Sequence, residues 1–193
     1  MADQKISAMP NAATLTGAET IPLVQSGANV KASLSTITAF VRDSYGAFSD
    51  FTDQLAALAN TSYAVTFNTV DYASGISVVS GSRITVSETG VYNFQWSGQF
   101  NNTLSQEHDV RVWIKLNGNN LAGSTGFIAI PGSHGGIDGH AVVGWNYFIS
   151  LNAGEYLELY WQADNTSVSL QTYAAGATFP STASVVATIN RVS

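Results

Sequence analysis

The clearest pattern in the chain is a strict alternation of apolar and polar residues between Gly90 and Phe100. Tyr92, Phe94 and Trp96 fall on one parity, as does Phe100, while the residues between them are Asn, Gln and Ser. Successive side chains of a strand point to opposite faces of a sheet. The pattern therefore predicts a strand with one face in a hydrophobic core.

Nine further apolar segments with turn residues between them predict more strands in the C-terminal two thirds of the chain. Including the first, the expected strands are 63–67, 76–79, 83–86, 91–100, 110–116, 127–130, 141–151, 156–162, 168–173 and 184–192. About ten short strands in roughly 130 residues are typical of an antiparallel sandwich, most often a jelly roll. We therefore expect an all-β jelly-roll head over residues 63–193.

Residues 1–45 lack the apolar content of a core and are predicted to form an extended arm, with turns and one small hairpin. Pro and Gly residues interrupt the short apolar pairs of this segment. Its apolar residues would let the arm become ordered on another surface. The candidate contacts are Ile6, Pro10, Leu15, Ile21, Leu23 and Val24.

From Leu34 the apolar spacing changes to three and four residues, which is typical of a helical seam. Gly46 interrupts the pattern, so two short helices are expected, the second starting near Ser49 or Asp50. They would form a neck over residues 46–62. Since short helices are marginal alone, the seam favours a bundle of sister chains over packing on the head. Its residues are Leu34, Ile37, Val41, Ser44, Phe48, Phe51, Leu55 and Leu58.

The run from Lys5 to Pro10, followed by the run from Thr14 to Gly27, resembles the N-terminal segment of bacteriophage fibre and virion surface proteins. The resemblance covers about the first forty residues. In those proteins this segment attaches the fibre to the particle. The resemblance implies that the arm binds other virion proteins.

A second resemblance covers residues 63–193. The segments Gly90 to Phe94, Val112 to Gly118 and Ile149 to Leu159 are similar to the trimeric jelly-roll heads of the complement globular-head and tumour-necrosis-factor superfamily. The closing segment from Ala187 to Val192 departs from the Gly-Phe pattern of the eukaryotic heads. The resemblance implies the fold and a homotrimer, and the departure argues against transferring the family's partners.

Tyr156 and Tyr160 share the outer face of the strand expected at 156–162, and Trp113 lies between two cations on another outer face. Large aromatic residues on an outer face are often interface anchors, although single exposed tyrosines are also common. We expect these three residues in the trimer interface of the head. The seam residues Phe48, Phe51, Leu55 and Leu58 would add contacts in the neck.

The composition narrows the possible partners. Only 10% of the residues are charged while 45% are hydrophobic, so the chain is expected to hide surface by association. A net charge of −6 argues against a nucleic-acid partner. No apolar run predicts membrane insertion, and no secretory leader is recognised. The absence of cysteine suggests synthesis in a reducing cytoplasm.

The loop 130–140 gathers the residue types that bind divalent metals, namely His134, Asp138 and His140. Their spacing fits no strong template, so solvated loop residues are the favoured interpretation. The chain also lacks a Gly-x-Ser-x-Gly elbow and a facing pair of carboxylates. We expect neither an enzyme nor a cofactor.

Together these features predict a homotrimeric virion surface protein, a tail or head fibre made in the host cytoplasm. Its jelly-roll head would attach to a host-surface glycan or protein through the loops 101–107 and 131–139. The alternative is a capsid or tail decoration protein that stabilises the particle without recognising the host. A secreted signalling trimer ranks last, because no leader is recognised.

Overall fold

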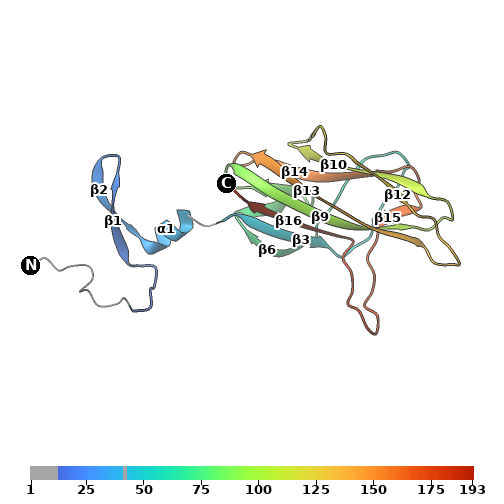
Figure 1. The fold of residues 1–193 in the computed structure, drawn as a ribbon, viewed down its shortest axis with the longest axis horizontal. Coiled ribbons are helices and arrows are strands. Elements are labelled where there is room, and N and C mark those ends of the chain that lie inside the picture. Colours follow the sequence, from blue (N-terminus) through green and yellow to red (C-terminus); the bar gives the residue numbers. More distant parts are fainter. Residues whose placement is uncertain (1–12, 41–42) are drawn as a thin grey trace, which may run out of the picture. The chain divides into compact units, whose positions relative to one another are not determined.

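The computed structural model describes residues 13–40 and 43–193, which belong to two compact units, Met1–Arg42 and Asp43–Ser193 (Figure 1). The first unit is a hairpin followed by a short helix, and the second is a β-sandwich. Ile6 and Pro10, two of the expected arm contacts, lie outside the described residues.

The first unit consists of β1 (Thr20–Gln25), β2 (Ala28–Ser33) and α1 (Leu34–Phe40). The two strands pair antiparallel, and Ser26 and Gly27 join them with φ values of 51° and 80°. Two successive positive φ values are the geometry of a type I′ turn, whose twist matches that of a hairpin. The Oγ of Ser33 accepts a hydrogen bond from the backbone N–H of Thr36 and so caps α1. The expected hairpin and the expected helix start at Leu34 are therefore present.

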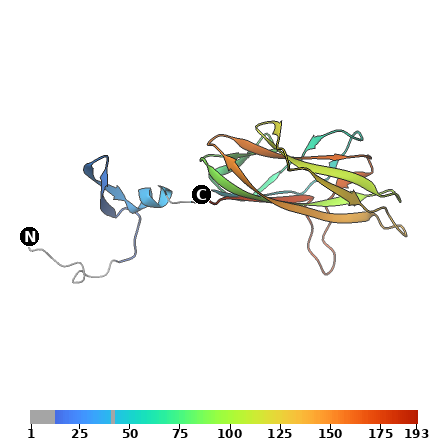
Figure 2. The same ribbon diagram turned by 45° about the horizontal axis from the view of Figure 1, so that its top comes forward.

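The second unit contains two sheets of seven strands each (Figures 1 and 2). The first sheet consists of β5 (Tyr63–Ala64), β7 (Ile76–Val79), β8 (Arg83–Val86), β10 (His108–Leu116), β11 (Asn119–Asn120), β12 (Gly126–Ile130) and β14 (Tyr156–Ala163). The second sheet consists of β3 (Tyr45–Asp50), β4 (Gln54–Leu55), β6 (Thr69–Ser74), β9 (Gly90–Asn102), β13 (Gly139–Leu151), β15 (Val168–Leu170) and β16 (Val185–Arg191).

The two sheets pack face to face and bury one side of the long strands β9, β10 and β14. In β9 the residues Tyr92, Phe94 and Phe100 are buried, as the alternation predicts. Trp161 of β14 and Ile114 of β10 contribute from the opposite sheet. All pairings between strands are antiparallel, and the prediction of an all-β jelly-roll sandwich is confirmed.

The expected helical neck over residues 46–62 is wrong. Residues 45–50 form β3, which pairs with β16 on one side and with β6 on the other. The sandwich therefore begins at β3 and not at residue 63. The apparent seam arose because Phe48 and its apolar neighbours recur at three and four residues by coincidence, while Gly46 and two serines give this segment little helix propensity.

The chain enters and leaves the sandwich at the same end. The backbone N–H of Arg191 donates to the carbonyl of Ser44, and that of Val91 donates to the carbonyl of Ser193. Since β9 runs from this end to Asn102, the loops 103–107, 131–138 and 164–167 lie at the opposite end of the sandwich. We call this opposite end the far end.

Candidate functional site

Three exposed aromatic residues lie at one edge of the sandwich. This edge is formed by β12 of the first sheet and β13 of the second. Phe127 is 70% exposed on the first sheet, Phe148 is 68% exposed on the second, and Trp145 between them is 55% exposed. We call these three residues the aromatic rim. Within residues 13–40 and 43–193, the strand β13 pairs only with β9, so its other edge carries unpaired backbone groups.

Trp145 and Tyr147 close the gap between the sheets at this edge. Their rings stack with centroids 6.0 Å apart, and a side chain on Gly126 of β12 would come within 3.2 Å of the Trp145 ring. The hydroxyl of Tyr147 donates to the carbonyl of Ser124 at 2.8 Å, and burial raises the pKa of Tyr147. These contacts pack Trp145 against Tyr147 and β12 at the centre of the rim.

Phe127 is covered on one side by a cation. The guanidinium carbon of Arg111 lies 5.1 Å from the centre of the Phe127 ring, which is within the range of a cation–π contact. The other side of the ring faces outward. Phe127 and Phe148 therefore lie on the outward faces of opposite sheets, on either side of Trp145 at this edge.

The outward face of the second sheet is hollowed beside the rim. Gln95, Ser97, Val186 and Thr188 border a shallow hollow of about 230 Å³. Gly144 of β13 lies opposite Ser97, and a Cβ atom on Gly144 would come within 2.7 Å of the carbonyl oxygen of Trp96. The hollow exists because the residues across this row of the sheet are small.

The predicted interface residues Trp113, Tyr156 and Tyr160 lie on the outward face of the first sheet and are half-buried within the chain. Lys115 Nζ lies 3.9 Å above the Tyr160 ring, and the Arg83 guanidinium lies 4.8 Å above the Tyr156 ring. Burial, and secondarily the nearby Glu158 carboxylate, raise the pKa of Tyr160. Side chains of the same chain cover much of these rings, and their place in an interface remains a prediction.

The neck residues of the predicted interface differ in their exposure. Phe48 is only 1% exposed and belongs to the core, so it is unavailable to a second chain and its assignment is wrong. Phe51, Leu55 and Leu58 are exposed, but they lie on β4 and its flanking loops and form no helical seam.

The metal-type residues of the loop 130–140 do not converge. His134 forms a turn with Ile137, Asp138 accepts a hydrogen bond from Asn101, and His140 contacts Tyr173 at 2.8 Å. Within residues 13–40 and 43–193, no group of three His, Cys, Asp or Glu side chains could hold a metal ion.

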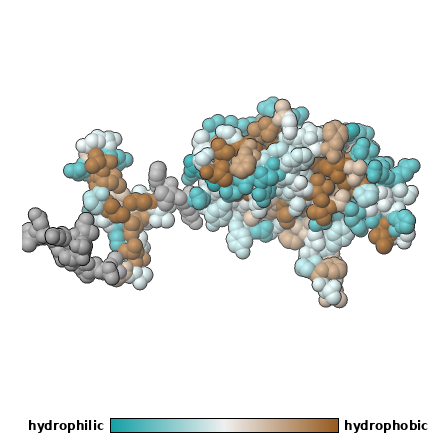
Figure 3. Space-filling view, viewed as in Figure 1, coloured by the Kyte–Doolittle hydropathy of each residue, from teal (hydrophilic) through white to brown (hydrophobic). Residues whose placement is uncertain are grey.

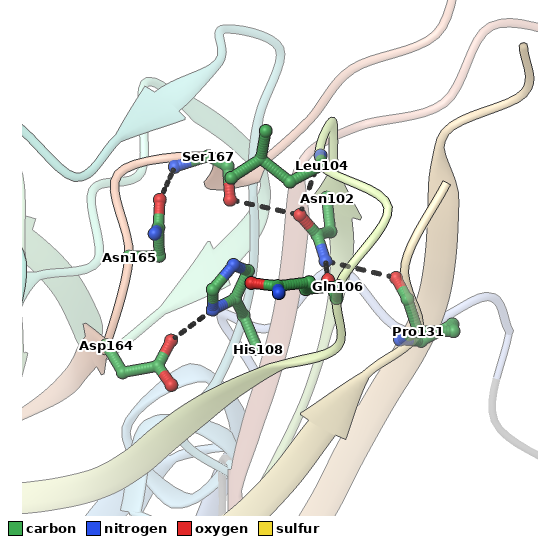
Figure 4. Close-up of polar contacts among 8 residues, drawn as sticks. All are labelled: Asn102, Leu104, Gln106, His108, Pro131, Asp164, Asn165 and Ser167. Carbon is green, nitrogen blue, oxygen red and sulfur yellow. Dashed lines mark hydrogen bonds and ion pairs between the residues drawn. The ribbon is translucent and has the colours of Figure 1, made fainter. Parts of the chain in front are cut away.

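Hydrogen bonds tie the far-end loops together (Figure 4). The buried Asn102 donates to the carbonyls of Gln106 and Pro131, and its Oδ1 accepts from Ser167 and from the N–H of Leu104. The Nδ1 of His108 lies 3.0 Å from Asp164 and joins β10 to the loop after β14. The far-end loops are therefore tied to one another by polar groups, while Leu104 and Ile137 are exposed among them.

In the first unit, Leu15, Ile21 and Val24 are exposed, as expected of contact residues in an arm. Leu23 is partly buried and lines a hollow of about 530 Å³ between the hairpin and α1, together with Val30 and Ile37. A unit of this size exposes most of its apolar side chains. No helix in the described part of the chain is long and apolar enough to cross a bilayer.

No protein-family model and no curated protein matches the chain. Similar solved structures include two crystal structures of murine APRIL, one at pH 5.0 and one at pH 8.5. Each is 9% identical to this chain, covers 78% of it and 100% of the murine chain, and has a TM-score of 0.50. At this identity the likeness concerns the fold alone, which is a tumour-necrosis-factor-like jelly roll.

Proposed function

We propose that this chain is a homotrimeric attachment protein on the surface of a bacteriophage particle. Its arm binds another virion protein, its sandwiches associate around a three-fold axis, and their far-end loops contact the host surface. The protein acts by binding and not by catalysis. The aromatic rim is the observation that carries this proposal.

The rim supports association because it concentrates exposed aromatic area in a chain that is short of charge. Phe127, Trp145 and Phe148 are more than half exposed, while only 10% of the residues are charged. Aromatic residues contribute strongly at interfaces because they bury a large area at low entropic cost. Figure 3 shows separate hydrophobic patches on this unit, consistent with more than one contact surface.

The occupant that we propose for the rim is a second copy of the chain. The rim projects at the edge of the sandwich, and the hollow bordered by Ser97 and Val186 lies on the outward face of the second sheet. An edge that packs against the face of the next copy makes a heterologous contact, and such contacts form a ring when the rotation between copies closes. A ring of three agrees with the resemblance of the head to trimeric jelly rolls.

The arm supports attachment through its exposed apolar residues. The first unit has one hairpin and one short helix, too little to bury Leu15, Ile21 and Val24. Binding to another virion protein would cover them. This assignment rests on the resemblance of residues 1–40 to the attachment segments of phage fibres.

The trimer would increase a weak affinity for the host surface. Three heads on one particle site raise the effective concentration of each further contact, which can strengthen overall binding by about 10² to 10⁴. Hydrogen bonds tie the loops at the far end together, and these loops expose both polar groups and the apolar Leu104 and Ile137, as suits contact with a glycan or peptide surface.

The substitution Phe148→Asp tests the rim. A carboxylate buried without a partner disfavours the contact strongly. We expect the mass of the full-length protein in light scattering to fall from three chains to one. Val79→Asp serves as the control, because Val79 is also an exposed apolar residue but lies on β7, away from the rim. A Phe148→Asp protein that keeps the mass of the unmodified protein would contradict the proposal.

Attachment itself is tested with the same pair of variants. Labelled trimer should adsorb to cells of the host bacterium, and the Phe148→Asp monomer should adsorb at least tenfold more weakly because avidity is lost. Particles that lack the protein should be equally stable but adsorb poorly. Reduced particle stability with normal adsorption would instead support the decoration function.

A further inference from the structure

A long loop, residues 172–184, projects from the second sheet (Figures 1 and 2). Between the loop and the outward face of the sheet lies a hollow of about 410 Å³. Its lining residues are Gln99, His140, Tyr173, Ala174, Phe179 and Thr182. The hollow is outside the rim and involves none of the residues predicted from the sequence except His140.

Hydrogen bonds hold the loop where it leaves the sheet and where it returns. The carboxylate of Asp53 accepts hydrogen bonds of 2.7 Å from the N–H and from the hydroxyl of Thr172. The N–H of Ser184 donates to the carbonyl of Asp50, and Tyr173 and Thr182 form a β-bridge. The loop is therefore held above the sheet in a defined position.

A directed chain of hydrogen bonds forms one wall of the hollow. The hydroxyl of Tyr173 donates to Asn101 Oδ1, whose amide nitrogen donates to Asp138. The Tyr173 hydroxyl also lies 2.8 Å from His140 Nδ1, and when its single proton is donated to Asn101, the proton of this second contact lies on Nδ1. In this tautomer Nε2 can accept a hydrogen bond from a ligand hydroxyl.

Tyr173 keeps its proton in this environment. Burial raises the pKa of its hydroxyl, and the carboxylates of Asp138 and Asp53 raise it further. The rings of Tyr173 and His140 also meet edge to face, with centroids 5.4 Å apart. The side chains of the polar wall are consequently held both by hydrogen bonds and by the contact between the two rings.

Phe179 supplies an aromatic surface on the loop side. Its side chain is 58% exposed, and its ring lies directly against Gly176, where a Cβ atom would come within 2.5 Å of the ring. The N–H of Gly176 also donates to the carbonyl of Phe179. The glycine thus allows the turn to hold an exposed ring over the hollow.

The lining specifies the chemistry of a ligand. It combines an exposed aromatic ring with a hydroxyl, an imidazole and an amide, and it contains no Lys or Arg. An anionic ligand is disfavoured by this lining and by the net charge of −6. A neutral ligand can satisfy both parts of the lining if hydroxyl groups lie around its edge and C–H groups form its face. The hydroxyls would bind the polar wall, and the C–H face would pack on the Phe179 ring.

We infer that the hollow between the loop 172–184 and β13 binds a neutral saccharide unit, with its C–H face on Phe179 and its hydroxyls on His140 and Tyr173. This inference rests on the proposed attachment function and assigns the host ligand to the glycan class. Gln99 and Thr182 offer further hydrogen-bonding groups for specificity.

The saccharide hollow and Phe148 of the rim are separated along β13. His140 and Phe148 lie on one strand, eight residues apart, which is about 26 Å at the rise of a strand. The saccharide hollow therefore lies well away from Phe148, while the hollow proposed for the next copy adjoins the saccharide hollow through Ser97 and Gln99 on β9.

The test is a titration of the full-length protein with neutral saccharides containing glucose, galactose, mannose or N-acetylglucosamine, followed by ligand-observed NMR and calorimetry. We expect at least one of them to bind with a millimolar or lower dissociation constant. Phe179→Ala should weaken that binding about tenfold, because the stacking surface is removed. Tyr173→Phe should weaken it as well, because it breaks the chain of hydrogen bonds that orients His140.

Tyr72→Ala is the matched control, since it removes an exposed aromatic ring from β6 at the opposite edge of the same sheet. It should leave the dissociation constant within twofold. Absence of binding to every saccharide would overturn the inference, as would binding that Phe179→Ala leaves unchanged. If the protein is nevertheless trimeric and adsorbs to host cells, the inference fails while the proposed function stands. Adsorption that saccharides do not compete would then indicate a protein receptor.

Discussion

At the scale of single residues, Asp50 stabilises the end of β3. Its side chain is almost fully buried, and its carboxylate accepts four hydrogen bonds, from the N–H and hydroxyl of Thr52, the hydroxyl of Thr66 and the amide of Asn68. A buried carboxylate is tolerated only when its oxygens are satisfied in this way. Asp50 thus joins β3 to the segment before β6 and supports the base of the projecting loop.

We predict that Asp50→Ala lowers the free energy of unfolding by about 3 kcal/mol, because several buried donors lose their acceptor. Urea denaturation of the full-length protein measures this change in the free energy of unfolding. Asp109→Ala, at an exposed position of β10, should change the free energy of unfolding by less than about 0.5 kcal/mol. Equal effects of the two substitutions would show that the network around Asp50 is not stabilising.

The sequence predicts which residues are buried better than which exposed residues matter. The alternation in β9 correctly assigns Tyr92 and Phe94 to the core. Phe127 and Phe148 were missed as contact residues, because alternation gives the face of a strand but not its place at an edge of the sheet. The hollow beside Phe179 was missed for a similar reason, since Tyr173 and His140 meet only through the pairing of distant strands.

At the scale of elements, the strands with long apolar alternation were predicted within one or two residues, and β7 and β8 at their observed bounds. The segment of β3 was misassigned, because a short apolar run does not distinguish a strand from a helix by its spacing. The strand β6 was not predicted, since Val70 and Tyr72 are exposed and leave no buried face to detect.

The turn before β1 depends on one carboxylate. Glu19 accepts hydrogen bonds from the N–H and hydroxyl of Thr16 and from the N–H of Gly17, and these bonds lower its pKa from 4.5 to about 2. The lowered pKa means that the ionised carboxylate of Glu19 is favoured when the turn is formed. The turn is therefore stabilised above pH 4.5, and this stabilisation is lost as the pH falls towards 2.

We predict that the carboxyl resonance of Glu19 in the full-length protein titrates with a midpoint near 2 in an NMR experiment. Thr16→Ala removes the hydroxyl donor and should move the midpoint up towards 4.5. A midpoint near 4.5 in the unmodified protein would show that the turn does not form in solution.

At the scale of the whole molecule, the jelly roll presents two surfaces of different chemical character. The edge of the sandwich carries the rim of Phe127, Trp145 and Phe148, while the far end carries loops joined by hydrogen bonds and the hollow beside Phe179. The fold could be predicted from strand alternation and resemblance. The positions of these two surfaces could not be predicted, because they depend on which strands form the edges of the sheets.

The central claim is that the sandwich itself forms the trimer, and the most direct measurement is its mass in solution. Light scattering should compare the full-length protein with residues 43–193, a fragment that retains β3, whereas a fragment that begins at Ser62 would lose it. We predict that each sample has three times the mass of its chain, which is 20.4 kDa for the full length. A monomeric fragment 43–193 would contradict the account, because the rim would then not associate.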